Sequence, residues 1–160
     1  MAVTNTSSKI SDFINRIAKD YPQFEFRAGN QEHWSPLTKT ITYDQGASTE
    51  ELKYGLLHEL CHALLEHNNY HSDFELLKLE SQAWQLAIKI GRKYKIKLDN
   101  EHIQDCLDTY RDWLHRRSQC PTCGMHVLQK DIKTYLCFNC GDSWQVSAGR
   151  FARPYRLKNS

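Results

Sequence analysis

Apolar side chains recur every three or four residues in several stretches of the chain, which is the spacing of an amphipathic helix. In the first of these stretches Ile10, Phe13 and Ile17 share one stripe, and Ser7 or Ser8 is expected to cap its start. The second stretch is preceded by the helix breaker Asp44-Gln45-Gly46 and begins with a capping-box pattern, Ser48 to Glu51. The helices are expected over residues 7–20, 48–67, 72–94 and 99–115.

Two short segments between the first two helices favour strands instead. Residues 24–26 (FEF) alternate apolar and polar, and residues 38–43 (TKTITY) are rich in β-branched side chains. The residues between them are expected to form a turn or a third short strand. The pattern therefore predicts an α+β fold in which a small antiparallel sheet packs on helices.

The second helix carries the sequence His58-Glu59-Leu60-Cys61-His62, an HExxH motif. Residues four apart share one face of a helix, so both imidazoles can bind one metal ion. Glu59 then lies beside the open coordination position, where a general base is needed. The motif predicts a zinc-dependent hydrolase of peptide bonds with Glu59 as its catalytic base.

A catalytic zinc site of this kind uses three protein ligands, so one more must come from another element. Glu80 is the first candidate, because it lies in the apolar stripe of the third helix between Leu76 and Ala83, where an ionised carboxylate is costly to bury without a cation. His71 is the alternative, nine residues beyond His62. The spacing of His67 from His62 predicts that its ring points away from the metal and that it ends the helix.

The strings LLHELCHALLEH and Glu80-Ser-Gln-Ala83-Trp-Gln-Leu-Ala87 resemble the ImmA/IrrE family of zinc metallopeptidases. The resemblance implies a zincin-like fold, a gluzincin-like site with Glu80 as third ligand, and regulated intracellular cleavage, often of a DNA-bound repressor. Trp84 and Leu86 stand where those proteins usually have Asn and Phe. The SprT-like family, which cleaves proteins crosslinked to DNA, is also similar, and there His71 would be the third ligand.

Four of the six cysteines form two CxxC pairs, each followed by glycine. Thiolates at this spacing bind one metal ion together, and a closed shell of four leaves no open position, which predicts a structural zinc. The two remaining thiols, Cys61 and Cys106, are expected to be reduced and buried. The two CxxC pairs together are expected to form a zinc ribbon. Its predicted zinc ligands are Cys120, Cys123, Cys137 and Cys140.

The sign of the net charge changes near residue 116, just before the first CxxC pair. Residues 1–115 carry 13 Lys and Arg against 17 Asp and Glu, whereas residues 116–160 carry 8 against 2. We therefore expect a metallopeptidase domain over 1–116 and a zinc ribbon with a basic tail over 117–160. Basic residues interleaved with an aromatic side chain suit binding to nucleic acid or to a partner protein. The residues predicted for that contact are Arg150, Arg153, Tyr155, Arg156 and Lys158.

Together these features predict a cytoplasmic zinc metallo-endopeptidase that contains one catalytic and one structural zinc and acts on a specific protein. Neither a membrane-spanning run nor an export signal is evident. Two alternatives stay open: a SprT-like protease acting on DNA-associated proteins, and a non-catalytic adaptor that binds DNA or protein through its ribbon. The side chain that would stabilise the oxyanion is also open, with four candidates: Tyr43, Tyr54, His67 and His71.

Overall fold

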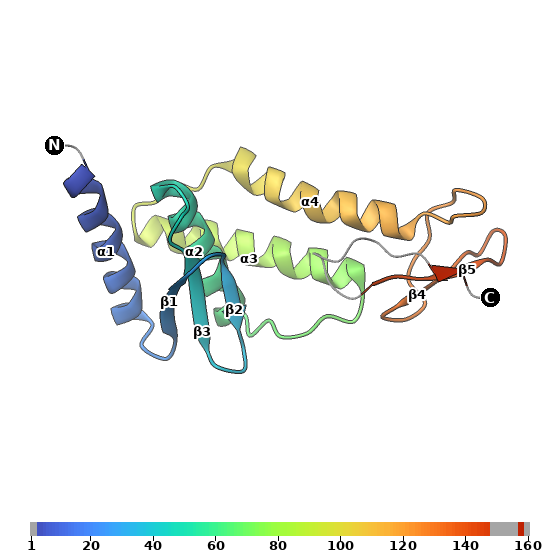
Figure 1. Cartoon of the computed structure of the whole chain (residues 1–160), viewed down its shortest axis with the longest axis horizontal. Coiled ribbons are helices and arrows are strands. Elements are labelled where there is room, and N and C mark those ends of the chain that lie inside the picture. The colour runs from blue at the N-terminus through green and yellow to red at the C-terminus, as the bar shows by residue number, and fades with distance from the viewer. Residues whose placement is uncertain (1–2, 148–156, 159–160) are drawn as a thin grey trace. The chain divides into compact units, whose positions relative to one another are not determined.

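The computed structural model describes residues 3–147 and 157–158, and Figure 1 shows the order of its elements. The helices are α1 (Val3–Asp20), α2 (Thr49–Leu64), α3 (Asp73–Lys93) and α4 (Asn100–Ser118). The strands are β1 (Glu25–Gly29), β2 (His33–Ser35), β3 (Thr40–Asp44), β4 (Thr134–Leu136), β5 (Ser143–Gln145) and β6 (Leu157–Lys158). The α+β class is confirmed, and within the described residues no helix is both long and apolar enough to cross a membrane.

The first sheet has the strand order β1-β3-β2 and is mixed, so the expectation of an antiparallel sheet is wrong. β2 runs antiparallel to β3, with Trp34 opposite Ile41, but β1 runs parallel to β3, with Phe26 opposite the same Ile41. The reason is the path of the chain. After β1 the chain passes to the far edge of the sheet, forms β2, and reverses through a tight turn into the central strand β3.

Helix boundaries follow the sequence signals to within one residue, except at three ends. α1 starts before residue 7, α2 ends at Leu64 and not at 67, and α4 continues past 115 to Ser118. Ser48 caps α2 through a complete capping box with Glu51, and the side chain of Asp99 caps α4 by accepting a hydrogen bond from the Glu101 backbone N–H (3.1 Å). α1 begins at Val3, several residues before Ser7 and Ser8, so neither serine is its N-cap.

The described residues form two compact units, and α3 contributes to both. The first unit takes in the described residues up to Asn68 together with Gln82–Leu98, and the second takes in Asn69–Ser81 with the described residues from Asp99 onward. In the first unit the apolar face of α2 packs on β3 and β2 (Figure 1). Its core is made by fully buried side chains from several elements: Ile17, Ile41, Leu56, Leu57, Leu60, Ala83 and Ala87.

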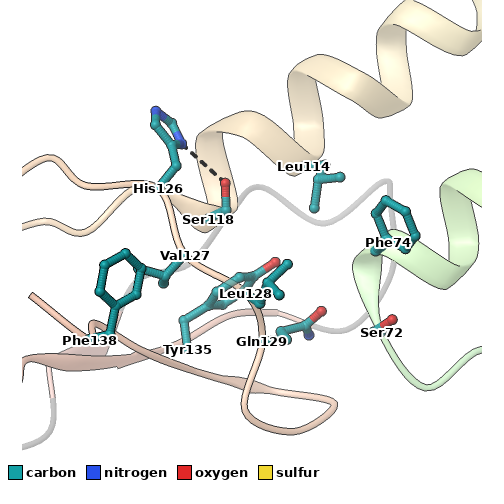
Figure 2. Close-up of a pocket in the computed structure, with 10 residues that line it drawn as sticks. All are labelled: Ser72, Phe74, Leu114, Ser118, His126, Val127, Leu128, Gln129, Tyr135 and Phe138. Atoms are coloured by element: carbon teal, nitrogen blue, oxygen red, sulfur yellow. Dashed lines mark hydrogen bonds between the residues drawn. The ribbon is translucent and has the colours of Figure 1, made fainter.

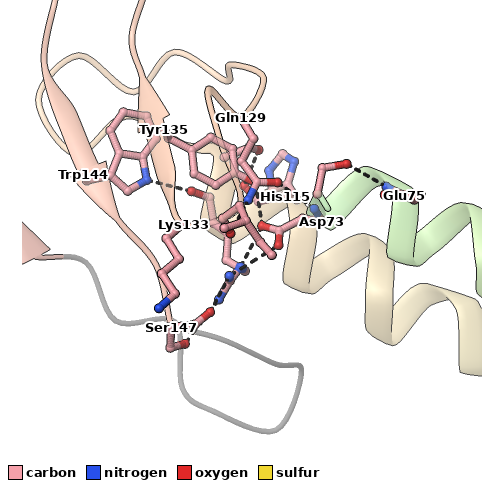
Figure 3. Close-up of polar contacts among 12 residues, drawn as sticks. Asp73, Glu75, His115, Gln129, Lys133, Tyr135, Trp144 and Ser147 are labelled. Carbon is pink, nitrogen blue, oxygen red and sulfur yellow. Dashed lines mark hydrogen bonds and ion pairs between the residues drawn. The ribbon is translucent and has the colours of Figure 1, made fainter. Parts of the chain in front are cut away.

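A buried ion pair organises the second unit (Figure 3). The Arg117 guanidinium donates to both carboxylate oxygens of Asp73 (2.8 and 3.4 Å), and each side chain is 2% exposed. The Tyr135 hydroxyl donates to the same carboxylate (2.6 Å), and Arg117 also donates to the backbone oxygen of Ser147 (2.6 Å). The Trp144 indole N–H donates to the Arg117 carbonyl oxygen (2.9 Å). The end of α4 is thus bonded to the segment that follows it.

These contacts explain why the compact units do not divide at residue 116. Arg117, expected just beyond a domain boundary, lies inside one hydrogen-bonded network with Asp73 and Trp144. Around them is an apolar core in which two of the cysteines take part: Cys120, Val127, Tyr135, Cys137, Trp144 and Val146. The division of the chain into domains 1–116 and 117–160 stays a prediction about independent folding.

Candidate metal centres

The two histidines of the HExxH motif lie on one buried face of α2. They are one helical turn apart, and their Nε2 atoms are 3.1 Å from each other. His58 is 8% exposed and His62 is 9% exposed, so both rings are largely withdrawn from water. Imidazole nitrogens in this arrangement can donate lone pairs to a single ion.

A third donor joins the histidines. One ligand atom from each of His58, His62 and Glu80 can be chosen so that all three lie within 4.8 Å of one another. Glu80 comes from α3 and is only 6% exposed. Burying a carboxylate costs free energy unless a cation or hydrogen-bond donors compensate it. Two imidazoles and a carboxylate are a donor set that zinc binds in catalytic sites, so these residues fit that metal.

The catalytic base predicted from the motif, Glu59, follows His58 directly and is half-buried on α2. The alternative third ligand, His71, does not join the cluster: its ring lies beside the Glu75 carboxylate (3.3 Å) and is 85% exposed. The backbone N–H of His71 also donates to Glu75 (2.7 Å), and this hydrogen bond is the main reason why the pKa of Glu75 is lowered.

The oxyanion candidates differ in what they contact. Tyr54, one turn before His58 on α2, donates its hydroxyl to the Lys97 carbonyl oxygen (3.2 Å), so that hydroxyl is already engaged. Tyr43 is half-buried at the end of β3. His67 instead lies against the cluster, since its Nδ1 is 2.9 Å from the Nδ1 of His62.

Sequence reasoning missed the contact of one aromatic side chain, Trp84, with the histidines. The Trp84 ring stacks on the His58 ring with centroids 4.1 Å apart and planes 23° apart, and it is 4% exposed. Trp84 is four residues after Glu80 and so shares its face of α3, which is the signal that could have revealed it. His67 contacts His62 at Nδ1, on the side of that ring away from His58, and no periodic signal could have shown this contact.

The four cysteines of the two CxxC pairs also cluster. One sulfur from each of Cys120, Cys123, Cys137 and Cys140 lies within 4.8 Å of the others. The distances from Cys120 Sγ to Cys140 Sγ and from Cys123 Sγ to Cys137 Sγ are both 3.6 Å, so the sulfurs are close without being bonded as disulfides. Such a group fits one tetrahedral ion.

Both CxxC turns have the same backbone design. Gly124 and Gly141 have φ of 75° and 78°, in the left-handed region that favours glycine. Each donates its N–H to the carbonyl oxygen of the first cysteine of its pair, at 2.9 Å in both turns. A hydrogen bond from the Asn139 amide, and then one from the Met125 backbone, lower the pKa of Cys123 to about 6, which favours the thiolate that a metal binds.

The other two thiols differ from each other. Cys61 is fully buried on α2, and burial raises the pKa of its thiol to about 12, so it is an inert part of the core. Cys106 is only half-buried, with its sulfur 3.6 Å from the Nε2 of His102. Neither forms a disulfide, as expected, but only Cys61 has the predicted burial.

A pocket of about 660 Å³ lies in the second unit and contains no member of either cluster (Figure 2). Its walls are mainly apolar and include exposed side chains of Phe74, Leu128 and Phe138. Its polar groups are already engaged: Ser118 bonds to His126 (3.2 Å), and the Tyr135 hydroxyl donates to Asp73 (2.6 Å). Because catalysis needs polar groups at the reacting atoms, the cluster of His58, His62 and Glu80 is a better candidate for chemistry than this pocket.

The basic tail lies largely outside the described residues. Four of its predicted contact residues, Arg150, Arg153, Tyr155 and Arg156, fall there, and only the backbone of Lys158 is described, in β6. Contact with nucleic acid or a partner protein stays a prediction.

Comparison with known families decides between the two resemblances seen in the sequence. The model of one family, Peptidase_M78, described as the IrrE N-terminal-like domain, matches residues 19–147, which is most of the chain. No curated protein and no solved structure matches the chain. The match includes the HExxH helix, Glu80 and all four clustered cysteines, and membership implies a bound metal, zinc. The chain therefore belongs to the Peptidase_M78 family, the metallopeptidases with an IrrE N-terminal-like domain.

Proposed function

We propose that the protein is a zinc metallo-endopeptidase of the gluzincin type, on a zincin-like arrangement of sheet and active helix, that cleaves a specific protein. The observation that carries the proposal is the buried group of His58, His62 and Glu80. Two of these residues belong to a motif that supplies its own base, and the third comes from a different helix. A structural role alone would not require a carboxylate that is 6% exposed beside two imidazoles.

In this proposal His58, His62 and Glu80 hold the catalytic zinc, which when bound activates water and polarises the substrate carbonyl. The Glu59 carboxylate accepts a proton from the attacking water. The water oxygen adds to the carbonyl carbon, and the electron pair of the C=O double bond moves to the carbonyl oxygen. Glu59 then passes the proton to the amine nitrogen, the carbon–nitrogen bond breaks, and the carbonyl re-forms. The Trp84 ring stacks on the His58 ring and restricts the rotation of that imidazole.

The second zinc, held by Cys120, Cys123, Cys137 and Cys140, is structural in this proposal. All four donors are protein sulfurs, so no coordination position is left for a substrate. Cys120 and Cys137 are 2% and 1% exposed and belong to the apolar core of their unit. Metal binding at these sulfurs therefore contributes to folding.

The substrate class we propose is a DNA-bound regulatory protein in the cytoplasm, on the strength of the family resemblance. The test is a comparison of new protein N-termini in cells that express the wild type or Glu59→Gln. Glu59→Gln removes the base but no ligand, so we expect full zinc content and the disappearance of one specific set of new N-termini. Glu50→Gln, an exposed change on the same helix, is the matched control and should keep them.

Metal counting separates the enzyme from a non-catalytic adaptor. We expect two zinc ions per chain in the wild type, one after Glu80→Ala, and two after His71→Phe. Cleavage that persists in Glu59→Gln refutes the mechanism. A wild type that holds only one zinc and keeps it in Glu80→Ala refutes the ligand set and supports the adaptor. Loss of a zinc in His71→Phe would transfer the third-ligand role to that residue.

A further inference from the structure

The ring of His67 meets the ring of His62 on the side away from His58. The two Nδ1 atoms are 2.9 Å apart, and the ring centroids are 5.0 Å apart with planes inclined by 68°. The geometry is that of a hydrogen bond between the imidazoles. His67 is half-buried, so water competes only partly for this contact.

The backbone around His67 is fixed by its neighbours. Glu66 has a φ of 55°, in the left-handed region, and this turns the chain back over the end of α2. The N–H of His67 donates to the His62 carbonyl oxygen (3.0 Å), and its own carbonyl oxygen accepts from the indole N–H of Trp34 on β2 (3.1 Å). These two bonds hold the backbone of His67 in place beside His62.

The two nitrogens of His62 have different surroundings. Its Nε2 faces the Nε2 of His58, inside the cluster with Glu80, while its Nδ1 faces His67. A nitrogen that binds a metal offers its lone pair, so in the neutral imidazole the proton must sit on the other nitrogen. Metal-binding histidines almost always donate that second N–H to an acceptor, which fixes the tautomer and the ring orientation.

We propose that His67 is a positioning residue for the zinc site: its Nδ1 accepts the Nδ1–H of His62 and so holds the Nε2 lone pair of His62 toward the metal. His67 itself then carries its proton on Nε2. This inference rests on the proposed function, because it requires zinc at His58, His62 and Glu80. The expected cost of losing such a partner is about 10–100-fold in metal affinity.

The test measures zinc retention by the full-length protein after dialysis against graded concentrations of a chelator, with zinc per chain determined by metal analysis. His67→Phe keeps a ring but no acceptor, and we expect the zinc lost on Glu80→Ala to leave at about 10–100-fold lower chelator activity. His67→Gln keeps an acceptor and should restore most of the affinity. His71→Phe, a nearby exposed histidine outside the cluster, should behave as the wild type.

A spectroscopic readout separates positioning from general damage. In the zinc-loaded wild type, proton–nitrogen spectra should locate a slowly exchanging proton on His62 Nδ1, and this signal should vanish in His67→Phe while the rest of the spectrum is kept. If His67→Phe does not fold, His67→Leu lacks the acceptor equally and repeats the measurement.

Two results would overturn the inference: wild-type zinc retention in the variants without an acceptor, or equal losses in His67→Gln and His67→Phe. Failure of the proposed function looks different. In that case the wild type itself would lack a zinc that depends on Glu80, whatever stands at position 67.

Discussion

At the scale of single residues, the unusual member of the site is Trp84. Its ring stacks on His58, and it comes from the same face of α3 as Glu80. One helix thus provides a carboxylate for the cluster and, one turn later, a flat apolar wall for one of its imidazoles. An aromatic wall restricts the rotation of the His58 ring and supplies contact area that a small polar residue would not.

Truncation of Trp84 should lower the stability of the fold, because this residue is only 4% exposed and packs in the core. For Trp84→Ala we expect a loss of about 3–5 kcal/mol in the free energy of unfolding, from lost burial and the cavity left behind. Trp84→Phe keeps an aromatic ring beside His58 and should lose clearly less. Urea unfolding followed by far-ultraviolet circular dichroism measures both, and equal losses would show that ring contact is unimportant.

At the scale of elements, the end of α1 is joined to the residue that follows α3. The Tyr94 hydroxyl donates to the Asp20 carboxylate (2.6 Å), and the Lys93 ammonium lies 3.0 Å from the same group. These contacts, the Tyr94 hydrogen bond first, hold the pKa of Asp20 below its ordinary value of 3.8. The first unit therefore depends on an ionised carboxylate at this point.

This link predicts a pH dependence of stability. Because the folded-state pKa of Asp20 is depressed, its contribution is complete above pH 3.8 and is lost as the pH falls through the lower folded-state value. Tyr94→Phe removes the largest cause of the shift, so the variant should lose less stability than the wild type over that acid range. Urea unfolding at a series of pH values tests this, and identical pH profiles would contradict it.

At the scale of the whole molecule, the second unit has a core that includes two of the candidate zinc ligands. Cys120 and Cys137 belong to the same buried cluster as Tyr135 and Trp144, whose rings stack with centroids 5.4 Å apart and planes 5° apart. Apart from the helices, the described residues of this unit form only short strands. We therefore expect the packing of its aromatic rings to require the metal.

Removal of the structural zinc should abolish the near-ultraviolet circular dichroism of Tyr135 and Trp144 while the helical far-ultraviolet signal largely remains. Cys137→Ser, which removes one sulfur from the cluster, should have the same effect as a strong chelator. Cys106→Ser also removes one thiol, but outside the cluster, and should change neither signal. A near-ultraviolet spectrum that survives in Cys137→Ser would show that packing alone orders the segment.

Local features were predictable because their causes are local. The capping box at Ser48, the helical period around Glu80 and the glycines of the CxxC turns each depend on neighbours within a few residues, and each is found as expected. Even the pairing of Glu80 with the HExxH motif could be inferred, since a lone carboxylate in an apolar stripe needs a cation.

What the sequence alone determined, then, was the set of helices, the α+β class and the residues that gather into the two candidate ligand clusters. Only the tertiary structure decided the parallel pairing of β1 with β3, the inclusion of Arg117 in a buried network, and the return of His67 onto His62. The physical reason is common to all three. Each depends on a chain reversal or a long-range contact, such as the left-handed turn at Glu66, that no periodic pattern of side chains encodes.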